Sequence, residues 1–481
     1  MPLKKRKNSA LLLVFLLGMF VTGHSQVDST GAVPADSSLQ DSMVMTYDQF
    51  IERVMKQHPM VFRARMKAEA GARGVQGAKG GFDPVVNGSV KQKYFSGSQY
   101  YSHIDGNLKV PTWFGLTAEA GYMQTDGVYL NPEARLPEDG LWYAGLNLEL
   151  GNGLLIDQRR AELKKARLYE DMTLLEQRVM TNQLMNEATI AYWKWAKAYE
   201  ILQIFSEALT AAELRLEAVK SYVEFGDYPG IYITEASMQY QSRMLSYQQA
   251  LLDWQNASLK LEIYLWDQGF VPLQLNGAVP NLISEVVQGM DVLFDVNTVI
   301  QNHPLVELNQ LDVARQRVDL RLKREYLKPK LTLEYRALNE PATTGFFSEY
   351  TVADYTWGAK LKYPLFTRRE RADVRIGELK VEQQQLKGVE IAAKLEYQLG
   401  AARNTIENLT GQYDIIGETI QAASDLLDAE VELFGNGESS LFMINSRELK
   451  FLEVRVKQVE LASKVEISKS ELNYGLLLIL P

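Results

Sequence analysis

The sequence predicts a mainly α protein with a transmembrane β part, built from one unit of helix, strands and long helical hairpin that occurs twice. The first observation is a repeat, because "QHPMV" at residues 57–61 returns as "NHPLV" at residues 302–306, 245 residues later. The second is a pair of long apolar patterns with helical period, each long enough for a helix of about 100 Å. The third is a set of short alternating segments before each long pattern, typical of β-strands.

The N-terminal residues have the pattern of a secretory signal peptide, predicted to span residues 1–25. Basic residues at positions 4–7 precede an apolar run at 10–21, and Gly23 and Ser25 are small residues suited to cleavage before Gln26. An apolar run of about twelve residues is too short for a spanning helix, which needs about 20. Residues 26–44 are polar and without period, so we predict a flexible leader there.

The first structural repeat is predicted to span residues 45–269. It begins with a helix, continues with β-strands at residues 85–150 and ends with a long helical hairpin at residues 157–265. Apolar residues in the hairpin follow steps of three and four, which is the a/d pattern of a coiled-coil seam. The seam includes Ala188, Ala191, Trp195, Ala198, Leu202, Phe205, Leu209 and Ala212. Apolar residues outside this seam imply further helical neighbours, in a bundle or an oligomer.

The second repeat is predicted to span residues 291–481, after an inter-repeat linker at residues 270–290. Its β-strands are expected at residues 330–364 and its long helical hairpin at residues 367–478. The helical seams of the two copies are 211 residues apart, from Ala191 to Ala402, whereas the starts of the copies are 245 apart. The first copy therefore carries about 34 extra residues among its strands, as an added hairpin or an extension, with four to six strands per chain.

Aromatic residues gather at the ends of the alternating segments, as they do in transmembrane β-strands. A soluble sheet with surface tyrosines is the alternative. We predict membrane-interface positions for Trp113, Tyr122, Trp142, Tyr143, Tyr355 and Trp357. Four to six strands are too few to close a barrel, and lipid tolerates no open sheet edge, so several chains are expected to share one barrel.

Composition and motifs exclude several function classes. Asp and Glu outnumber Lys and Arg by 60 to 51, so no basic excess is present for binding nucleic acid. The chain has no cysteine, which excludes disulfides, thiolate metal sites and cysteine nucleophiles. We find no catalytic, cofactor-binding or metal-binding motif. His58 and His303 precede proline at equivalent places in the repeat, which predicts a shared structural role such as a helix cap.

Several short motifs occur in a definite order along the chain. They are "HP" at His58 and again at His303, "PLF" at residues 364–366, and the hairpin turns "FGDYPGIYITEA" at residues 225–236 and "GESSLFMINSRE" at residues 437–448. Together with the repeat spacing they resemble the TolC-like outer-membrane efflux channel family, the outer-membrane channels of tripartite efflux and type I secretion systems. The resemblance covers essentially the whole mature chain.

The resemblance implies a homotrimer in the outer membrane, in which strands of three chains form one barrel in contact with lipid. The helical hairpins would form a coiled-coil tunnel in the periplasm. Substrates would pass passively after delivery by an inner-membrane transporter and a periplasmic adaptor (membrane fusion) protein. The hairpin turns would form the periplasmic tip and contact the adaptor, through Phe225, Gly226, Asp227, Gly230, Phe434, Gly435, Gly437, Glu438 and Ser439.

The tip departs from the family pattern. Family members often carry acidic residues just after the tip turns, where three chains build charged rings that favour cations. With Gly226 aligned to Gly437, the corresponding residues are Tyr232 and Met443, with Ser446 one turn further. We therefore predict an apolar constriction at Tyr232 and Met443, closed by packing and dewetting, with simple helix packing as the alternative.

A second departure follows the "PLF" motif. The paired glycines usual there in the family are replaced by Thr367 and Arg368. The bend between strand and helix is therefore expected to differ at this place.

Two other function classes remain as alternatives. A non-conducting coiled-coil envelope spacer or adhesin would explain the long helices, but it leaves the repeated strands without a role. An exported enzyme would require a convergent polar pocket. Conductance separates the channel from both, and the sequence alone does not select the transported substrate.

Overall fold

The computed structural model describes residues 44–285, 295–340 and 353–476. The chain divides into two units, Met1–Ser38 and Leu39–Pro481, and every described residue belongs to the second. The predicted signal peptide and almost all of the predicted leader lie outside the described residues. Parts of the predicted linker, of the second strand region and of the C-terminal end also lie outside them.

The first repeat contains four helices and four strands: α1 (Tyr47–Gln57), α2 (Pro59–Lys79), β1 (Val85–Phe95), β2 (Ser98–Pro111), β3 (Leu116–Asp126), β4 (Leu141–Gly151), α3 (Gln158–Glu224) and α4 (Ile231–Glu262). The second contains α5 (Val296–Gln301), α6 (Pro304–Glu325), β5 (Lys330–Asn339), β6 (Tyr355–Lys362), α7 (Arg368–Gly435) and α8 (Leu441–Leu476). The prediction of a mainly α fold with a duplicated helix, strand and hairpin unit is confirmed.

Helix starts in the two repeats use the same side-chain caps. His58 precedes α2 and His303 precedes α6, and in each case proline is the first helical residue. The Nδ1 atom of His58 accepts a hydrogen bond from the amide of Met60 at 3.1 Å, and that of His303 accepts one from Leu305 at 3.2 Å. Burial lowers the pKa of both imidazoles, which favours the neutral ring that can accept. The predicted shared structural role is therefore confirmed as N-capping.

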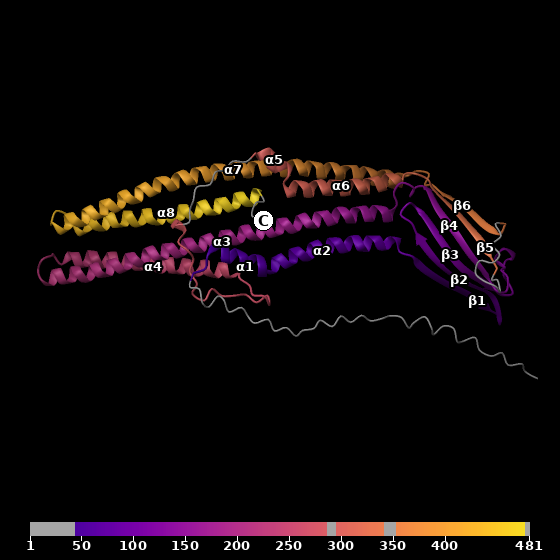
Figure 1. The fold of residues 1–481 in the computed structure, drawn as a ribbon, viewed down its shortest axis with the longest axis horizontal. Helices are drawn as coiled ribbons and strands as arrows, with labels where there is room; N and C mark the ends of the chain where they lie inside the picture. The colour runs from indigo at the N-terminus through magenta and orange to yellow at the C-terminus, as the bar shows by residue number, and fades with distance from the viewer. Residues whose placement is uncertain (1–43, 286–294, 341–352, 477–481) are drawn as a thin grey trace, which may run out of the picture. The chain divides into compact units, whose positions relative to one another are not determined.

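The long helices form two antiparallel hairpins, α3 with α4 and α7 with α8 (Figure 1). Helix α2 runs along α3 and α6 along α7, and α3 also contacts α6 and α8, so α3 joins the two repeats. The main core lies at this junction, where Trp195 and Tyr192 of α3 and Phe50 of α1 are almost fully buried. The indole N–H of Trp195 donates to the hydroxyl of Ser258 in α4 at 3.0 Å. Every predicted seam residue of α3 is buried or half-buried.

All six strands form one antiparallel sheet in the order β1-β2-β3-β4-β5-β6. The β4–β5 pairing joins the two repeats, and β1 and β6 are the edges. Four strands come from the first repeat and two from the second, so the extra residues of the first copy supply an additional hairpin. Within the described ranges, none of the helices combines the length and the apolarity that a membrane crossing requires.

The segment after α4 is fixed to α3 by one buried carboxylate. Glu200 accepts hydrogen bonds from the amides of Ile283 at 2.8 Å and Ser284 at 3.3 Å, and from the Ser284 hydroxyl. Ile283 is fully buried in the main core. The described part of the predicted inter-repeat linker is therefore docked rather than loose, because the carboxylate caps a short 3₁₀ turn at Ile283–Glu285.

Replacing Glu200 with alanine should lower the free energy of unfolding by about 2–4 kcal/mol, because it leaves buried amide donors without an acceptor. Unfolding in detergent can be followed by circular dichroism at increasing denaturant. The matched control is Glu213→Ala, an exposed glutamate on the same helix. Equal effects of the two substitutions would contradict the docking role of Glu200.

Candidate functional site

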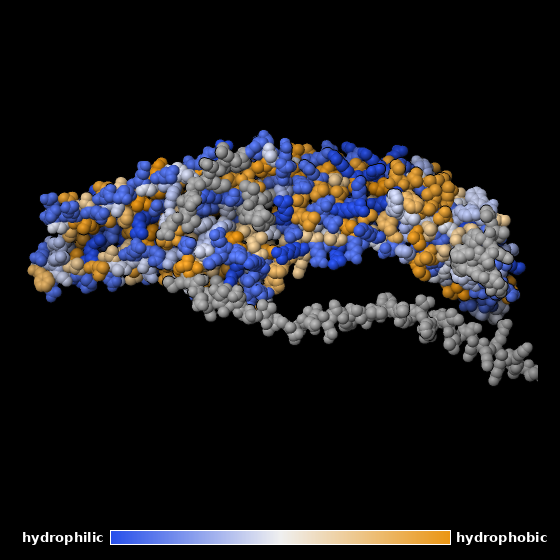
Figure 2. Space-filling view, viewed as in Figure 1, coloured by the Kyte–Doolittle hydropathy of each residue, from blue (hydrophilic) through white to orange (hydrophobic). Residues whose placement is uncertain are grey.

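The sheet has one apolar and one polar face. Because successive side chains of a strand point to opposite faces, and directly paired residues share a face, the register assigns every residue to one side. Leu146 pairs with Tyr335 and Tyr335 with Trp357, which places a row of apolar residues on one face. That face also carries Val86, Leu108, Val110, Ala118, Ala120, Tyr122, Trp142, Ala144, Leu148, Leu333, Ala337 and Tyr355. Hydrophobic side chains gather over the strand region in Figure 2.

The opposite face is hydrophilic and is cross-linked by charged side chains. Arg336 of β5 forms an ion pair with Glu119 of β3, which is 6% exposed. Lys330 bonds Glu149 across β5 and β4 at 2.8 Å. Asn87, Asn107, Asn147, Thr332 and Glu334 lie on the same face. A sheet with one apolar and one charged face is suited to separate lipid from water.

The predicted interface aromatics divide between the faces. Tyr122, Trp142, Tyr355 and Trp357 all lie on the apolar face. Tyr143 does not: it lies on the polar face, almost fully buried, with its hydroxyl 3.4 Å from Asp105. The register therefore separates Tyr143 from Trp142, since neighbours along a strand point to opposite faces.

Trp113 lies outside the strands, in the turn between β2 and β3. Its ring is largely exposed and packs edge-on against Phe114, with ring centroids 5.4 Å apart. It thus belongs to the end of the sheet nearer the helices.

Both helical hairpins turn through the same local structure. Gly226 and Gly437 have φ of 85° and 79°, a backbone conformation that glycine adopts at no steric cost. The amide of Gly226 donates to Val223 and that of Asp227 to Tyr222, and the bonds from Gly437 to Phe434 and from Glu438 to Leu433 match them. These paired bonds define a Schellman C-cap at the end of α3 and of α7.

The matching turn positions are 211 residues apart, which agrees with the helical seams. The "FG" pairs of the two tips do not occupy matching positions. Gly435 is the last residue of α7, whereas Gly226 lies two residues beyond the end of α3, so the two "FG" pairs are offset by two residues. Phe225 is 80% exposed at one tip, whereas Phe434 is half-buried against Tyr228, with ring centroids 5.9 Å apart. Asp227, Gly230 and Glu438 are exposed, and the hydroxyl of Ser439 bonds Glu430.

Apolar residues hold the two tips together. Val219, Ala236 and Leu441 form a buried cluster that includes residues from both hairpins. Tyr232 is half-buried against this cluster and lies 5.5 Å from the ring of Tyr228. Met443 is half-buried and Ser446 exposed. Tyr232 thus takes part in packing within one chain.

A polar network connects α3, α4 and α8 next to this apolar cluster, on the side away from the turns. Arg215 of α3 bonds Glu448 of α8 at 2.5 Å and Asn445 at 3.2 Å, and Asn445 bonds Glu235 of α4 at 3.3 Å. Arg243 of α4 is 2% exposed, and burial lowers the pKa of its guanidinium. Glu448 supplies a countercharge to both arginines, so the network ties the two hairpins together near their ends.

The two strand-to-helix junctions differ, as expected from the missing glycines. In the first copy, Gly151 and Gly153 provide the positive φ values, and Asp157 caps α3 by accepting from Arg160 at 2.8 Å. In the second copy Thr367 takes the left-handed conformation, with φ of 42°, and its side chain makes no capping bond. A β-branched residue is unfavourable in this conformation.

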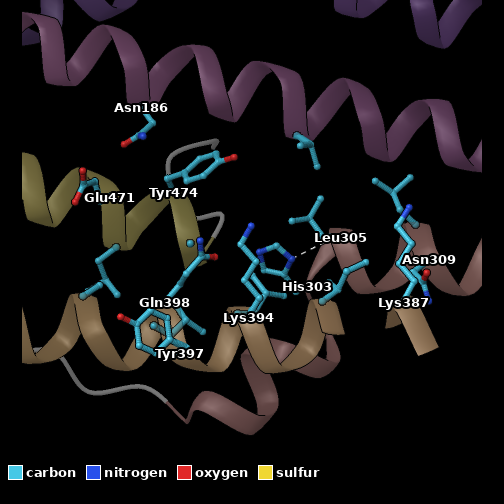
Figure 3. Close-up of a pocket in the computed structure, with 18 of the residues that line it drawn as sticks. Asn186, His303, Leu305, Asn309, Lys387, Lys394, Tyr397, Gln398, Glu471 and Tyr474 are labelled. Carbon is cyan, nitrogen blue, oxygen red and sulfur yellow. Dashed lines mark hydrogen bonds between the residues drawn. The ribbon is translucent and has the colours of Figure 1, made fainter. Parts of the chain in front are cut away.

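A cavity of about 920 Å³ lies where α8 ends and α6 begins along α7 (Figure 3). Asn186 of α3, His303 and Asn309 of α6, Lys394 of α7 and Tyr474 of α8 line it. The Nδ1 atom of His303 points to the amide of Leu305, because it caps α6. Across the described part of the chain, no group of three or more His, Asp and Glu side chains is arranged to hold a metal ion.

Solved structures of outer-membrane channels share this fold. The CmeC outer membrane channel of Campylobacter jejuni superimposes with a TM-score of 0.63 at 13% identity, over 91% of this chain and 86% of that chain. The open state of the MtrE outer membrane channel of Neisseria gonorrhoeae gives 0.67 at 13% identity, over 89% and 88%. The outer membrane protein VceC of Vibrio cholerae gives 0.63 at 12% identity, over 89% and 95%.

The chain matches no protein-family model and no curated protein sequence. At 12–13% identity the structural likeness establishes the fold alone. That fold, helical hairpins continuing into a strand sheet, is the one that the sequence resemblance implied.

Two features escaped sequence reasoning. The network near the tips joins residues from α3, α4 and α8 that no motif in the sequence marked. On α4, Met238, Leu245, Leu252 and Leu259 are exposed at intervals of seven residues. This stripe was detectable as a heptad repeat, and it has the pattern of a coiled-coil seam that no described residue of the same chain covers.

Replacing Glu448 with glutamine should loosen the tips, because it removes the carboxylate that faces the buried guanidinium of Arg243 and the half-buried guanidinium of Arg215. We expect amide hydrogen exchange around Arg215 and at the start of α8 to accelerate about tenfold or more. The control is Glu453→Gln on the same helix, whose carboxylate pairs with Lys450 in solvent. Unchanged exchange at the tips of the Glu448 variant would contradict a linking role for the network.

Proposed function

We propose that the protein is the outer-membrane channel of a tripartite efflux or type I secretion system, acting as a homotrimer. The observation that carries this proposal is the six-stranded sheet with one apolar face, one charged face and two edge strands, β1 and β6. The fold shared with CmeC, MtrE and VceC, which are outer-membrane proteins, supports the location.

The edges of the sheet explain why several chains are needed. Unpaired N–H and C=O groups at a sheet edge are costly in lipid, so β6 of one chain must pair with β1 of another. Three copies of the six-stranded sheet give eighteen strands. Barrels of about 16–18 strands are wide enough for an aqueous channel. The apolar faces would then contact outer-membrane lipid, with Tyr122, Trp142, Tyr355 and Trp357 among them, and the charged faces would line water.

The helices carry a second surface suited to assembly. The exposed heptad stripe of α4, from Met238 to Leu259, lies along the same tip-side length as exposed apolar residues on α7 such as Ile415 and Leu426. Packing the stripe of α4 against α7 of a neighbouring chain would bury both. Repeated around a threefold axis, this pairing closes a tunnel of helices in the periplasm.

The tunnel would receive cargo at its tip. The exposed tip residues Phe225, Asp227 and Glu438 are suited to contact a periplasmic adaptor protein, which connects the channel to an inner-membrane transporter. The transporter selects and drives the cargo, and the channel conducts passively without catalytic chemistry. The apolar ends of α4 and α8, with Tyr232 and Met443, would form the constriction.

Cysteine pairs test the shared barrel directly, since the chain contains no cysteine of its own. Ser89→Cys in β1 is combined in turn with Thr356→Cys, Gly358→Cys and Lys360→Cys, which share the polar face of β6. Oxidation should produce covalent dimers and trimers, because β1 and β6 belong to neighbouring chains.

The control for this experiment is Asn87→Cys with Asn107→Cys, directly opposed residues within one chain. This pair should bridge without any change of mass on a non-reducing gel. Exclusive bridging within one chain by the β1–β6 pairs would overturn the shared barrel.

Alanine at both Tyr232 and Met443 should raise single-channel conductance, because it removes the apolar side chains that close the tip. The matched control is Gln241→Ala with Leu449→Ala, which are exposed residues further along the same two helices and outside the α4 stripe. A conductance equal to that of the wild type would mean that these residues only pack helices, and it would remove the constriction from the proposal.

A further inference from the structure

The polar face of the sheet carries a surplus of positive charge. Seven basic side chains lie on it: Lys91, Lys93, Lys109, Lys330, Arg336, Lys360 and Lys362. Among the described residues of the six strands, only four acidic side chains share it: Asp105, Glu119, Glu149 and Glu334. This balance is opposite to that of the whole chain, whose net charge is −9.

The acidic side chains of this face are already engaged. Glu119 contacts both Arg336 and Lys109, and Glu149 bonds Lys330. Asp105 accepts from Asn107 and lies near the Tyr143 hydroxyl, while Glu334 accepts from Asn147. Glu119 and Glu149 therefore pair with the three cations in the middle of the sheet, whereas Asp105 and Glu334 bond neutral amides. With seven basic and four acidic side chains, the face keeps a net charge of +3.

Four lysines on the two edge strands are left over, and we call them the edge lysines. They are Lys91 and Lys93 of β1 and Lys360 and Lys362 of β6. All four are exposed, and none forms an ion pair with a described residue. Lys93 lies 4.8 Å from the ring centroid of Tyr100, a contact that leaves its charge intact.

The positions of the edge lysines concentrate their charge in an assembly. Pairing of β6 with β1 of the next chain brings lysines of two chains to the same seam, and three seams distribute them around the lumen. Charged side chains that line a narrow aqueous passage set its ion preference, because the low-dielectric wall focuses their field.

We propose that the edge lysines make the β-lined part of the channel selective for small anions over small cations. This inference rests on the proposed channel function. Lysine on an edge strand also protects against aggregation, which is a role in assembly and not in conduction. The two roles are separated by measuring ion preference on assembled trimers.

The test is the reversal potential of single channels in a KCl gradient. The wild-type channel should pass Cl⁻ at least about twofold better than K⁺ at 0.1 M salt, and the preference should weaken at 1 M, where the Debye length falls to about 3 Å. Replacing all four edge lysines with glutamine should at least halve the ratio of Cl⁻ to K⁺ permeability. Both channels are also measured with Tyr232→Ala and Met443→Ala, so that a closed tip does not hide the barrel.

The matched control is Lys330→Gln with Glu149→Gln, which removes an ion pair from the same face without changing its net charge. This control should keep the wild-type ratio. A channel that conducts without anion preference, or whose ratio is the same in the edge-lysine variant, overturns this inference and leaves the channel function intact. Absence of conductance in every variant would instead overturn the channel function, and this inference with it.

Discussion

Every β-strand edge must find a hydrogen-bonding partner when it is placed in lipid, and this constraint accounts for most of the architecture. Six strands with an apolar face cannot satisfy it alone, because β1 and β6 each have one paired neighbour within the described sheet. The proposed solution is assembly, in which each edge is completed by another copy. Helices α3 and α7 leave the sheet after β4 and β6, so in the proposed assembly they would continue the symmetry of the barrel.

The two copies of the repeat use the same devices to start and end their helices. Each copy supplies a capping histidine before the helix that precedes its strands, α2 or α6, and a Schellman turn at the tip of its hairpin. The two hairpins are then joined along α3 by a large aromatic core around Trp195 and, near the tips, by the Arg215–Glu448 pair. The aromatic core holds the two hairpins together in the middle of α3, and the polar network holds them together near their tips.

Sequence reasoning predicted the periodic features well and the placement of single side chains less well. The coiled-coil seam from Ala188 to Ala212 and the ends of α3 and α7 followed from period and glycine, both of which are local. The histidine caps followed from the repeat. By contrast, the prediction that grouped Tyr143 with Trp142 did not apply the alternation of side chains along a strand, which places Tyr143 on the polar face. The partners of Arg243 and Glu448 come from different helices, so no local pattern marks them.

The central claim is that three chains form one conducting pore, and single-channel recording of the mature protein tests it most directly. The detergent-purified protein is inserted into a planar bilayer, and its oligomeric mass is determined on the same sample. The account predicts a trimer that forms stable channels, with the Tyr232→Ala, Met443→Ala variant as the open reference. A monomer that forms no channel in either version would contradict the account and favour a non-conducting coiled-coil spacer.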